Sequence, residues 1–96
     1  GDLISAQDAF DMGLVSEIVI DGEVEKRAIA MAHQIAELPP LAIEQVKECV
    51  LRGMDGALDT GLALETKAIQ MLFASQDQKE GMAAFIEKRK AKFTGT

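Results

Sequence analysis

The residues best suited to chemistry lie near the carboxyl end, in the segment EGMAAFIEKRKAKF that runs from Glu80 to Phe93. Helical spacing predicts an apolar stripe that contains Phe85, with lysines such as Lys88 along its edges. A flat ring on Phe85 and an anion on a neighbouring ammonium are the elements of an adenosine-phosphate contact. A solvated amphipathic helix has the same pattern, so spacing alone leaves both interpretations open. The predicted apolar side comprises Met82, Phe85, Ile86, Arg89 and Phe93.

No other set of residues forms a catalytic constellation. The single histidine, His33, and the single cysteine, Cys49, fall on different predicted helices without metal-ligand spacing. His33 has no neighbouring nucleophile to activate, which favours a surface or packed histidine. The glycines occur singly rather than in a phosphate-binding loop. We therefore predict no catalytic residue and no metal site in this chain, and a packed structural thiol at Cys49.

Size and composition bound the class of protein. Ninety-six residues, 48% hydrophobic and 27% charged, predict one globular domain or part of one. No apolar run approaches the roughly 20 residues of a membrane helix, and the chain shows no targeting sequence of its own. A single cysteine cannot form an internal disulfide and suits a reducing compartment. The prediction is a protein of the cytoplasm that does not span a membrane.

Charge is unevenly distributed along the chain. The net charge of -6 argues against a nucleic-acid partner, because duplex affinity comes largely from neutralising phosphates. Residues 1–25 carry seven acids and no base, whereas five of the ten basic residues lie in positions 79–96. A local anion site near the carboxyl end is therefore compatible with the acidic balance.

Local signals predict a short helix and then a strand-like segment in the first part of the chain. Ser5 is expected to cap the helix, with Asp8 at its third position and Gly13 closing it in a left-handed conformation. Residues 14–20 are rich in β-branched side chains and precede a turn, which is typical of a strand. No second strand-like run follows, so the partner strand is predicted to lie outside this chain.

Helical periodicity dominates the remainder. It predicts a helix that ends before the proline pair at 39–40, another that starts there and stops at Gly53, a long third, and a last one that begins near Gln76 and carries the basic segment. The predicted fold class is mainly α, a small bundle of about five helices with one short strand-like segment. Residues 1–21 would form a helix and strand-like linker, and residues 22–96 a helical carboxy-terminal domain.

An acid interrupts the apolar seam of the long helix. Glu65 occupies a seam position between Leu62 and Ile69 where an apolar residue is expected. A buried carboxylate needs a cationic or donor partner. A structural ion pair with Lys47 or Arg89 is therefore favoured over an acid-base role.

Four blocks stand in a distinctive order along the chain, namely GDLISAQDAFDMGLVSEIV, ELPPLAIEQVK, GLALETKA and FASQDQKEGMAAFIEKRKAKF. Together they resemble the carboxy-terminal segment of the crotonase superfamily, the enoyl-CoA hydratase/isomerase family. The resemblance implies a parent enzyme in which a spiral β/α core precedes this helical part and homo-oligomers form as trimers or dimers of trimers. It also implies that residues 15–20 pack against that core domain, which would supply the missing strand partner.

The resemblance implies recognition rather than catalysis for this chain. Family chemistry adds water to 2-enoyl-CoA, or shifts its double bond, through a thioester enolate whose oxyanion hole and glutamates would lie upstream of Gly1. The chain alone is therefore expected to be inactive. By resemblance, Lys88 contacts the 3′-phosphate of coenzyme A, Phe85 lies near the adenine or acyl region of a neighbouring subunit's site, and Ile69 borders the acyl tail. The coenzyme A thioester would be the substrate, with no tightly bound cofactor.

Two other hypotheses remain open. One is a free-standing helical module for homo-oligomerisation or interaction, which binds no ligand and whose basic edge is only solvated. The other, a nucleic-acid module that uses residues 88–92, is disfavoured by the acidic balance. The sequence upstream of Gly1 separates the enzyme from the free-standing module, because only the enzyme requires a spiral core there.

Overall fold

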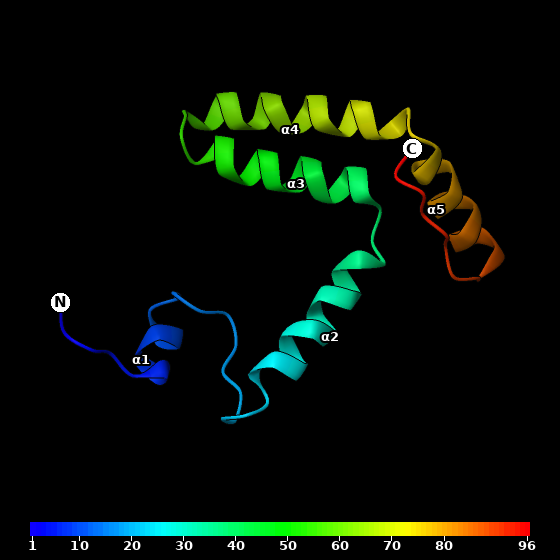
Figure 1. The fold of residues 1–96 in the computed structure, drawn as a ribbon. Coiled ribbons are helices and arrows are strands. Elements are labelled where there is room, and N and C mark those ends of the chain that lie inside the picture. The colour runs from blue at the N-terminus through cyan, green and yellow to red at the C-terminus, as the bar shows by residue number, and fades with distance from the viewer. The chain divides into compact units, whose positions relative to one another are not determined.

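The computed structural model describes residues 1–96 and contains five helices and no strand (Figure 1). The helices are, in chain order, α1 (Ala6–Asp11), α2 (Val24–Ala36), α3 (Pro40–Gly53), α4 (Leu58–Phe73) and α5 (Gln76–Glu87). They fall in two compact units, Gly1–His33 and Gln34–Thr96, each of which is described by itself. The predicted mainly α class with about five helices is confirmed.

The caps predicted for the first helix are present on α1. Asp8 N–H donates to Ser5 Oγ over 3.0 Å, and Ser5 N–H donates to Asp8 Oδ2 over 3.3 Å, which completes a capping box. Hydrogen bonds from the hydroxyl and then the backbone amide of Ser5 lower the pKa of the Asp8 carboxyl. Gly13, at φ 77°, closes the helix, and Leu14 N–H donates to the Ala9 carbonyl over 2.8 Å.

The strand predicted for residues 14–20 is not formed. Most of this segment is irregular backbone, and it leads into a turn at Asp21 and Gly22. A strand requires a neighbour for its N–H and C=O groups, and the chain supplies no second extended run. The segment is tied instead to α2, because Arg27 Nε lies 2.7 Å from Glu17 Oε1.

Two glycines allow α3 and α4 to approach closely. Pro40 is the first residue of α3 and Gly53 the last, as the sequence predicted. The two helices lie side by side and run in opposite directions (Figure 1). A Cβ atom at Gly61 on α4 would lie only 3.4 Å from the Cα of Gly53. Their backbones therefore meet where neither helix has a side chain.

A leucine at this crossing should destabilise the helix pair. We expect Gly61→Leu to lower the free energy of unfolding by about 1–3 kcal/mol, because the new side chain must displace the backbone of α3. Ala63→Leu is the matched control, since Ala63 is an exposed residue of the same helix. Denaturant unfolding of both variants measures the difference, and equal effects would contradict the close contact.

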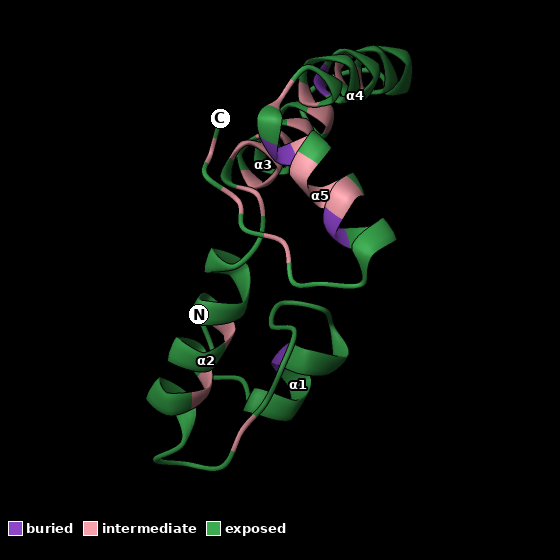
Figure 2. Cartoon of the chain, turned by 90° about the vertical axis from the view of Figure 1, so that its right-hand side faces the viewer, coloured by how far each residue is buried: buried purple, intermediate pink, exposed green.

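Few apolar side chains are buried in the chain. The buried ones are Ala9, Ala68 and Ala84, whereas larger residues such as Val46 on α3 and Leu62 on α4 stay exposed (Figure 2). Contiguous exposed apolar surface is typical of faces that pack against another chain or domain. The helices thus present apolar faces that this chain alone leaves in water.

The ion pair predicted for Glu65 is absent. Its side chain is exposed, neither Lys47 nor any other base pairs with it, and Arg89 binds Glu80 instead. The prediction was wrong because the seam of α4 is itself uncovered, as the exposed Leu62 shows. A carboxylate on an uncovered seam keeps its water and needs no buried cation.

Candidate functional site

The last helix, α5, begins where the sequence predicted. Ser75 is its N-cap, and its Oγ accepts from Gln78 N–H over 3.1 Å. The first helical residue is Gln76, so the cap fixes the register of every residue that follows.

The end of α5 differs from the prediction. The helix was expected to continue through the basic segment, but it ends at Glu87, and Lys88 adopts a left-handed conformation with φ 54°. Arg89 N–H donates to the Ala84 carbonyl over 3.0 Å, and Lys88 N–H donates to the Phe85 carbonyl over 3.3 Å, the pattern of a Schellman motif. The predicted apolar stripe therefore loses Arg89 and Phe93, which lie beyond the helix.

The same motif ends α1, but there a glycine holds the left-handed position. Gly13 adopts φ 77° at no steric cost, whereas Lys88 is the non-glycine residue of this chain with a positive φ. The left-handed conformation costs an L-residue about 1–2 kcal/mol. The surrounding contacts must offset this strain for Lys88 to stay in place.

A buried carboxylate holds the segment that follows the turn, residues 89–96, here called the tail. The tail runs back beside α5 (Figure 1). Asp77, only 3% exposed, accepts from Thr94 N–H over 2.7 Å and from Gly95 N–H over 2.8 Å. In return, Gln76 and Asp77 donate their backbone N–H groups to the Thr96 carbonyl over 2.8 and 3.0 Å. The tail thus caps the start of the helix from which it departs.

An ion pair fixes the other end of the tail. Two guanidinium nitrogens of Arg89 lie 2.6 and 2.9 Å from the two carboxylate oxygens of Glu80, and Lys92 N–H donates to the same carboxylate over 2.8 Å. The Arg89 hydrogen bonds and then that of Lys92 lower the pKa of Glu80 to about 2. Hydrogen bonds to Glu80 and then to Glu87 raise the pKa of Arg89. Arg89 is thus engaged in an ion pair within the chain, with Glu80 rather than with the predicted Glu65.

Replacing Glu80 should change the acid sensitivity of the fold. The pKa of Glu80 is lower in the folded chain than its ordinary 4.5, so its ionised form stabilises the fold above about pH 4.5. That contribution is lost as the pH falls toward about 2, the folded-state pKa. We expect Glu80→Gln to be less stable than the wild type at pH 7, with a difference that shrinks through this window.

Thermal unfolding between pH 7 and pH 2 measures this effect. Glu48→Gln is the control, because it removes the same charge from an exposed residue that makes no ion pair. A constant gap between Glu80→Gln and the wild type at all pH values would contradict the assignment.

The basic residues of the segment divide into paired and unpaired ones. Arg89 binds Glu80, and Lys90 Nζ lies 2.7 Å from Glu37 Oε1 in an exposed ion pair. The side chain of Lys88 is exposed and makes no ion pair. Its ammonium is therefore available to an anion from outside the chain.

The predicted recognition residues fall in two places. Phe85 and Lys88 come together on the last turn of α5 and the residue that closes it, with the Phe85 side chain 82% exposed. Ile69, the predicted acyl-tail residue, lies on α4 and is 47% exposed. An exposed aromatic ring and an unpaired ammonium thus lie three residues apart at the end of α5, the two kinds of group that a stacked base and a phosphate would require.

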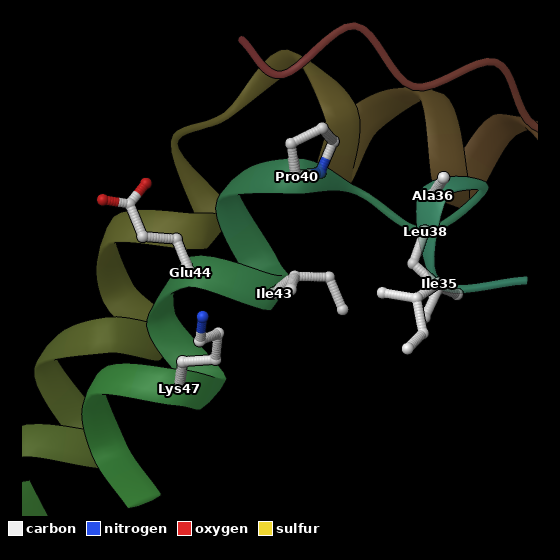
Figure 3. Close-up of a pocket in the computed structure, with 7 residues that line it drawn as sticks. All are labelled: Ile35, Ala36, Leu38, Pro40, Ile43, Glu44 and Lys47. Carbon is white, nitrogen blue, oxygen red and sulfur yellow. The ribbon is translucent and has the colours of Figure 1, made fainter. Parts of the chain in front are cut away.

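An apolar hollow of about 440 Å³ lies apart from these residues, between the end of α2 and α3. Figure 3 shows Ile35, Leu38 and Ile43 with their side chains toward this hollow, while the Glu44 carboxylate points away. It is open surface rather than a closed ligand cavity, and it continues the exposed apolar face of α3.

A second hollow, of about 290 Å³, separates α3 from the start of α5 and the tail. The ring of Phe93 helps to line it and lies against Gly81, where a Cβ atom would meet Phe93 Cε1 at 3.5 Å. Gly81 thus leaves room for the returning tail, and Phe93 holds the tail from its apolar side.

Asp77 and Glu80 were not recognised from the sequence as tail anchors. Acids near the start of a helix are ordinarily explained by the helix dipole alone, which conceals a second role. A signal did exist, because two acids one helical turn apart precede a basic segment that must end the helix. The sequence pattern does not show that the chain reverses direction at Lys88.

Other chemical groups do not gather into a site. His33 is exposed on α2, Cys49 is half-buried on α3, and no group of three His, Cys, Asp or Glu residues is placed to hold a metal ion. None of the helices is long and apolar enough to cross a membrane.

Comparison with known proteins gives consistent matches over nearly the whole chain. Residues 1–96 match the sequence profile of the family described as enoyl-CoA hydratase/isomerase. The chain is 44% identical over 93 residues to the mitochondrial enoyl-CoA hydratase of Pongo abelii, a match that covers 97% of this chain and 32% of that protein. It is 40% identical over 92 residues to the crotonyl-CoA hydratase of Syntrophomonas wolfei, covering 96% of this chain and 35% of that protein.

A solved structure matches nearly the whole chain. Enoyl-CoA hydratase from Bacillus anthracis matches with a TM-score of 0.93 at 38% identity, over 97% of this chain and 36% of that one. The chain spans about a third of the length of the curated relatives it matches.

Proposed function

We propose, from the premise that the chain belongs to the enoyl-CoA hydratase/isomerase family, that residues 1–96 are the carboxy-terminal part of an acyl-CoA-processing enzyme. The parent enzyme would add water to a 2-enoyl-CoA, or shift its double bond, through a thioester enolate. The observation that carries the proposal is a match over nearly all of this chain but only about a third of its relatives. The remaining two-thirds would supply the catalytic core.

The exposed apolar faces support this assignment. Val46 on α3, Leu62 on α4 and the hollow between α2 and α3 would be covered by the core domain or by a neighbouring subunit. We propose a trimer or hexamer for the full enzyme and a cytoplasmic location. Sedimentation of the full enzyme and fractionation of cells would check the two points.

Coenzyme A recognition is the part of the function that this chain would perform. Lys88 would bind the 3′-phosphate, Phe85 would lie near the adenine or acyl region, and Ile69 would border the acyl tail. The unpaired ammonium of Lys88 and the exposed ring of Phe85, three residues apart in the chain, support the first two roles.

Hydration of crotonyl-CoA tests the proposal. The protein that carries this chain, with its upstream region, is incubated with crotonyl-CoA, and loss of the conjugated double bond is followed in the ultraviolet. We expect hydration by the full protein and none by residues 1–96 alone. A full protein that oligomerises but neither hydrates nor isomerises enoyl-CoA thioesters would instead support the free-standing interaction module.

A further inference from the structure

We propose that Glu80 and Arg89 are positioning residues for phosphate recognition: their ion pair holds the turn that presents the Lys88 ammonium. The inference rests on the proposed function, because it takes the 3′-phosphate of coenzyme A as the anion that Lys88 meets. It adds two residues that would act on the ligand only through Lys88.

The first support is the position of the ion pair around the turn. Glu80 lies in the second turn of α5, and Arg89 is the residue directly after Lys88. Both carboxylate oxygens of Glu80 are engaged, at 2.6 and 2.9 Å, so the orientation of the guanidinium is fixed as well as its distance. Anchoring Arg89 on one side and α5 on the other restrains the backbone of Lys88 between them.

The second support is the strain at Lys88. A lysine at φ 54° would relax by continuing the right-handed helix, which would turn its side chain to another face of α5. Relaxation would also break the Arg89–Glu80 pair and the bond from Lys92 N–H to Glu80, because the tail could no longer run back. The ion pair therefore opposes the loss of the left-handed turn.

The third support is the local charge. Arg89 pairs with two carboxylates, that of Glu80 and that of Glu87, whose Oε2 lies beside the Arg89 Nε. Its guanidinium is thus occupied within the chain and does not compete for an external anion. The guanidinium in turn offsets part of the negative charge of Glu80, which therefore repels a phosphate less than an unpaired carboxylate would. Lys88 is left as the free cation of this turn.

Holding one flexible side chain in its bound arrangement is worth about 0.5–1.5 kcal/mol of affinity, or about two- to tenfold in a dissociation constant. Loss of the ion pair should reduce phosphate recognition by this factor. It should leave the chemical step and the rest of the coenzyme A contact in place.

The test compares crotonyl-CoA with its 3′-dephospho analogue as substrates of the full enzyme. The ratio of the two KM values measures recognition of the phosphate alone, and a general loss of structure raises both KM values together. Glu80→Gln and the charge-conserving Arg89→Lys, which cannot form the two-pronged pair, are compared with the wild type. Glu48→Gln is the control for the charge change, and Lys88→Ala is the reference for complete loss of the contact.

We expect both positioning variants to raise the KM for crotonyl-CoA about two- to tenfold, with kcat nearly unchanged and little effect on the dephospho substrate. Suppose that Lys88→Ala abolishes the preference for the phosphorylated substrate but both positioning variants keep the wild-type ratio of the two KM values. That result would overturn the inference and leave the proposed function intact. If Lys88→Ala itself keeps the preference, the assigned role of Lys88 is wrong and the inference is overturned with it.

Discussion

Asp77→Ala should release the tail from α5. We expect the substitution to weaken the attachment of the tail to the helix by about 3 kcal/mol. The carboxylate is 3% exposed and accepts the N–H groups of Thr94 and Gly95 together with the Thr94 hydroxyl. Hydrogen bonds to a charged group contribute about 1.5–3 kcal/mol each, and alanine leaves the donors without an acceptor. The Thr96 carbonyl should then also leave the backbone of Gln76.

Hydrogen exchange in the full enzyme measures this release. The amides of Thr94 and Gly95 should exchange about a hundredfold faster in Asp77→Ala, as a change of about 3 kcal/mol requires. Asp59→Ala is the matched control, because Asp59 is an exposed first-turn acid of α4. Equal protection of the two tail amides in Asp77→Ala and the wild type would show that Asp77 does not hold the tail.

Replacing Lys88 by glycine should weaken coenzyme A binding but stabilise the fold. We expect Lys88→Ala to raise the KM for crotonyl-CoA about tenfold with a smaller change in kcat, because a remote phosphate contact contributes mainly uniform binding. Lys88→Gly should weaken binding equally but stabilise the turn by about 1 kcal/mol, because glycine adopts φ 54° without strain.

Steady-state kinetics and thermal unfolding of the same variants check both effects. Lys79→Ala provides the control, since Lys79 is an exposed lysine of α5 without an ion pair. An unchanged KM in Lys88→Ala would remove Lys88 from the site. A glycine variant less stable than the alanine variant would contradict the strain at this position.

Features set by contacts within a few residues could be predicted from the sequence. Ser5 and Ser75 cap their helices through amides three residues ahead, and Pro40 starts α3 because its ring fixes the backbone of a first helical residue. Gly13 likewise adopts its left-handed conformation without help from a distant residue, because glycine has no Cβ atom. Such signals are complete within the local segment.

Features that depend on distant partners could not be predicted in the same way. The segment around Ile18 has the composition of a strand, but strand pairing is decided by a neighbour that this chain does not contain. Lys88 has no intrinsic preference for a left-handed turn, which depends on Asp77 and Glu80 accepting the returning tail. Glu65 was assigned a buried partner because periodicity does not show whether a seam is covered. The recognition roles of Lys88, Phe85 and Ile69 stay predictions.

The hairpin of α5 and tail makes the tail an intramolecular ligand of its own helix. A short connection holds such a ligand at a millimolar effective concentration. The few hydrogen bonds at Asp77 and Glu80 suffice only at that concentration, because a peptide of this length must otherwise offset the full entropic cost of association. A single cut by trypsin after Lys88 would therefore free the tail, although it breaks none of the hydrogen bonds between the tail and Asp77 or Glu80.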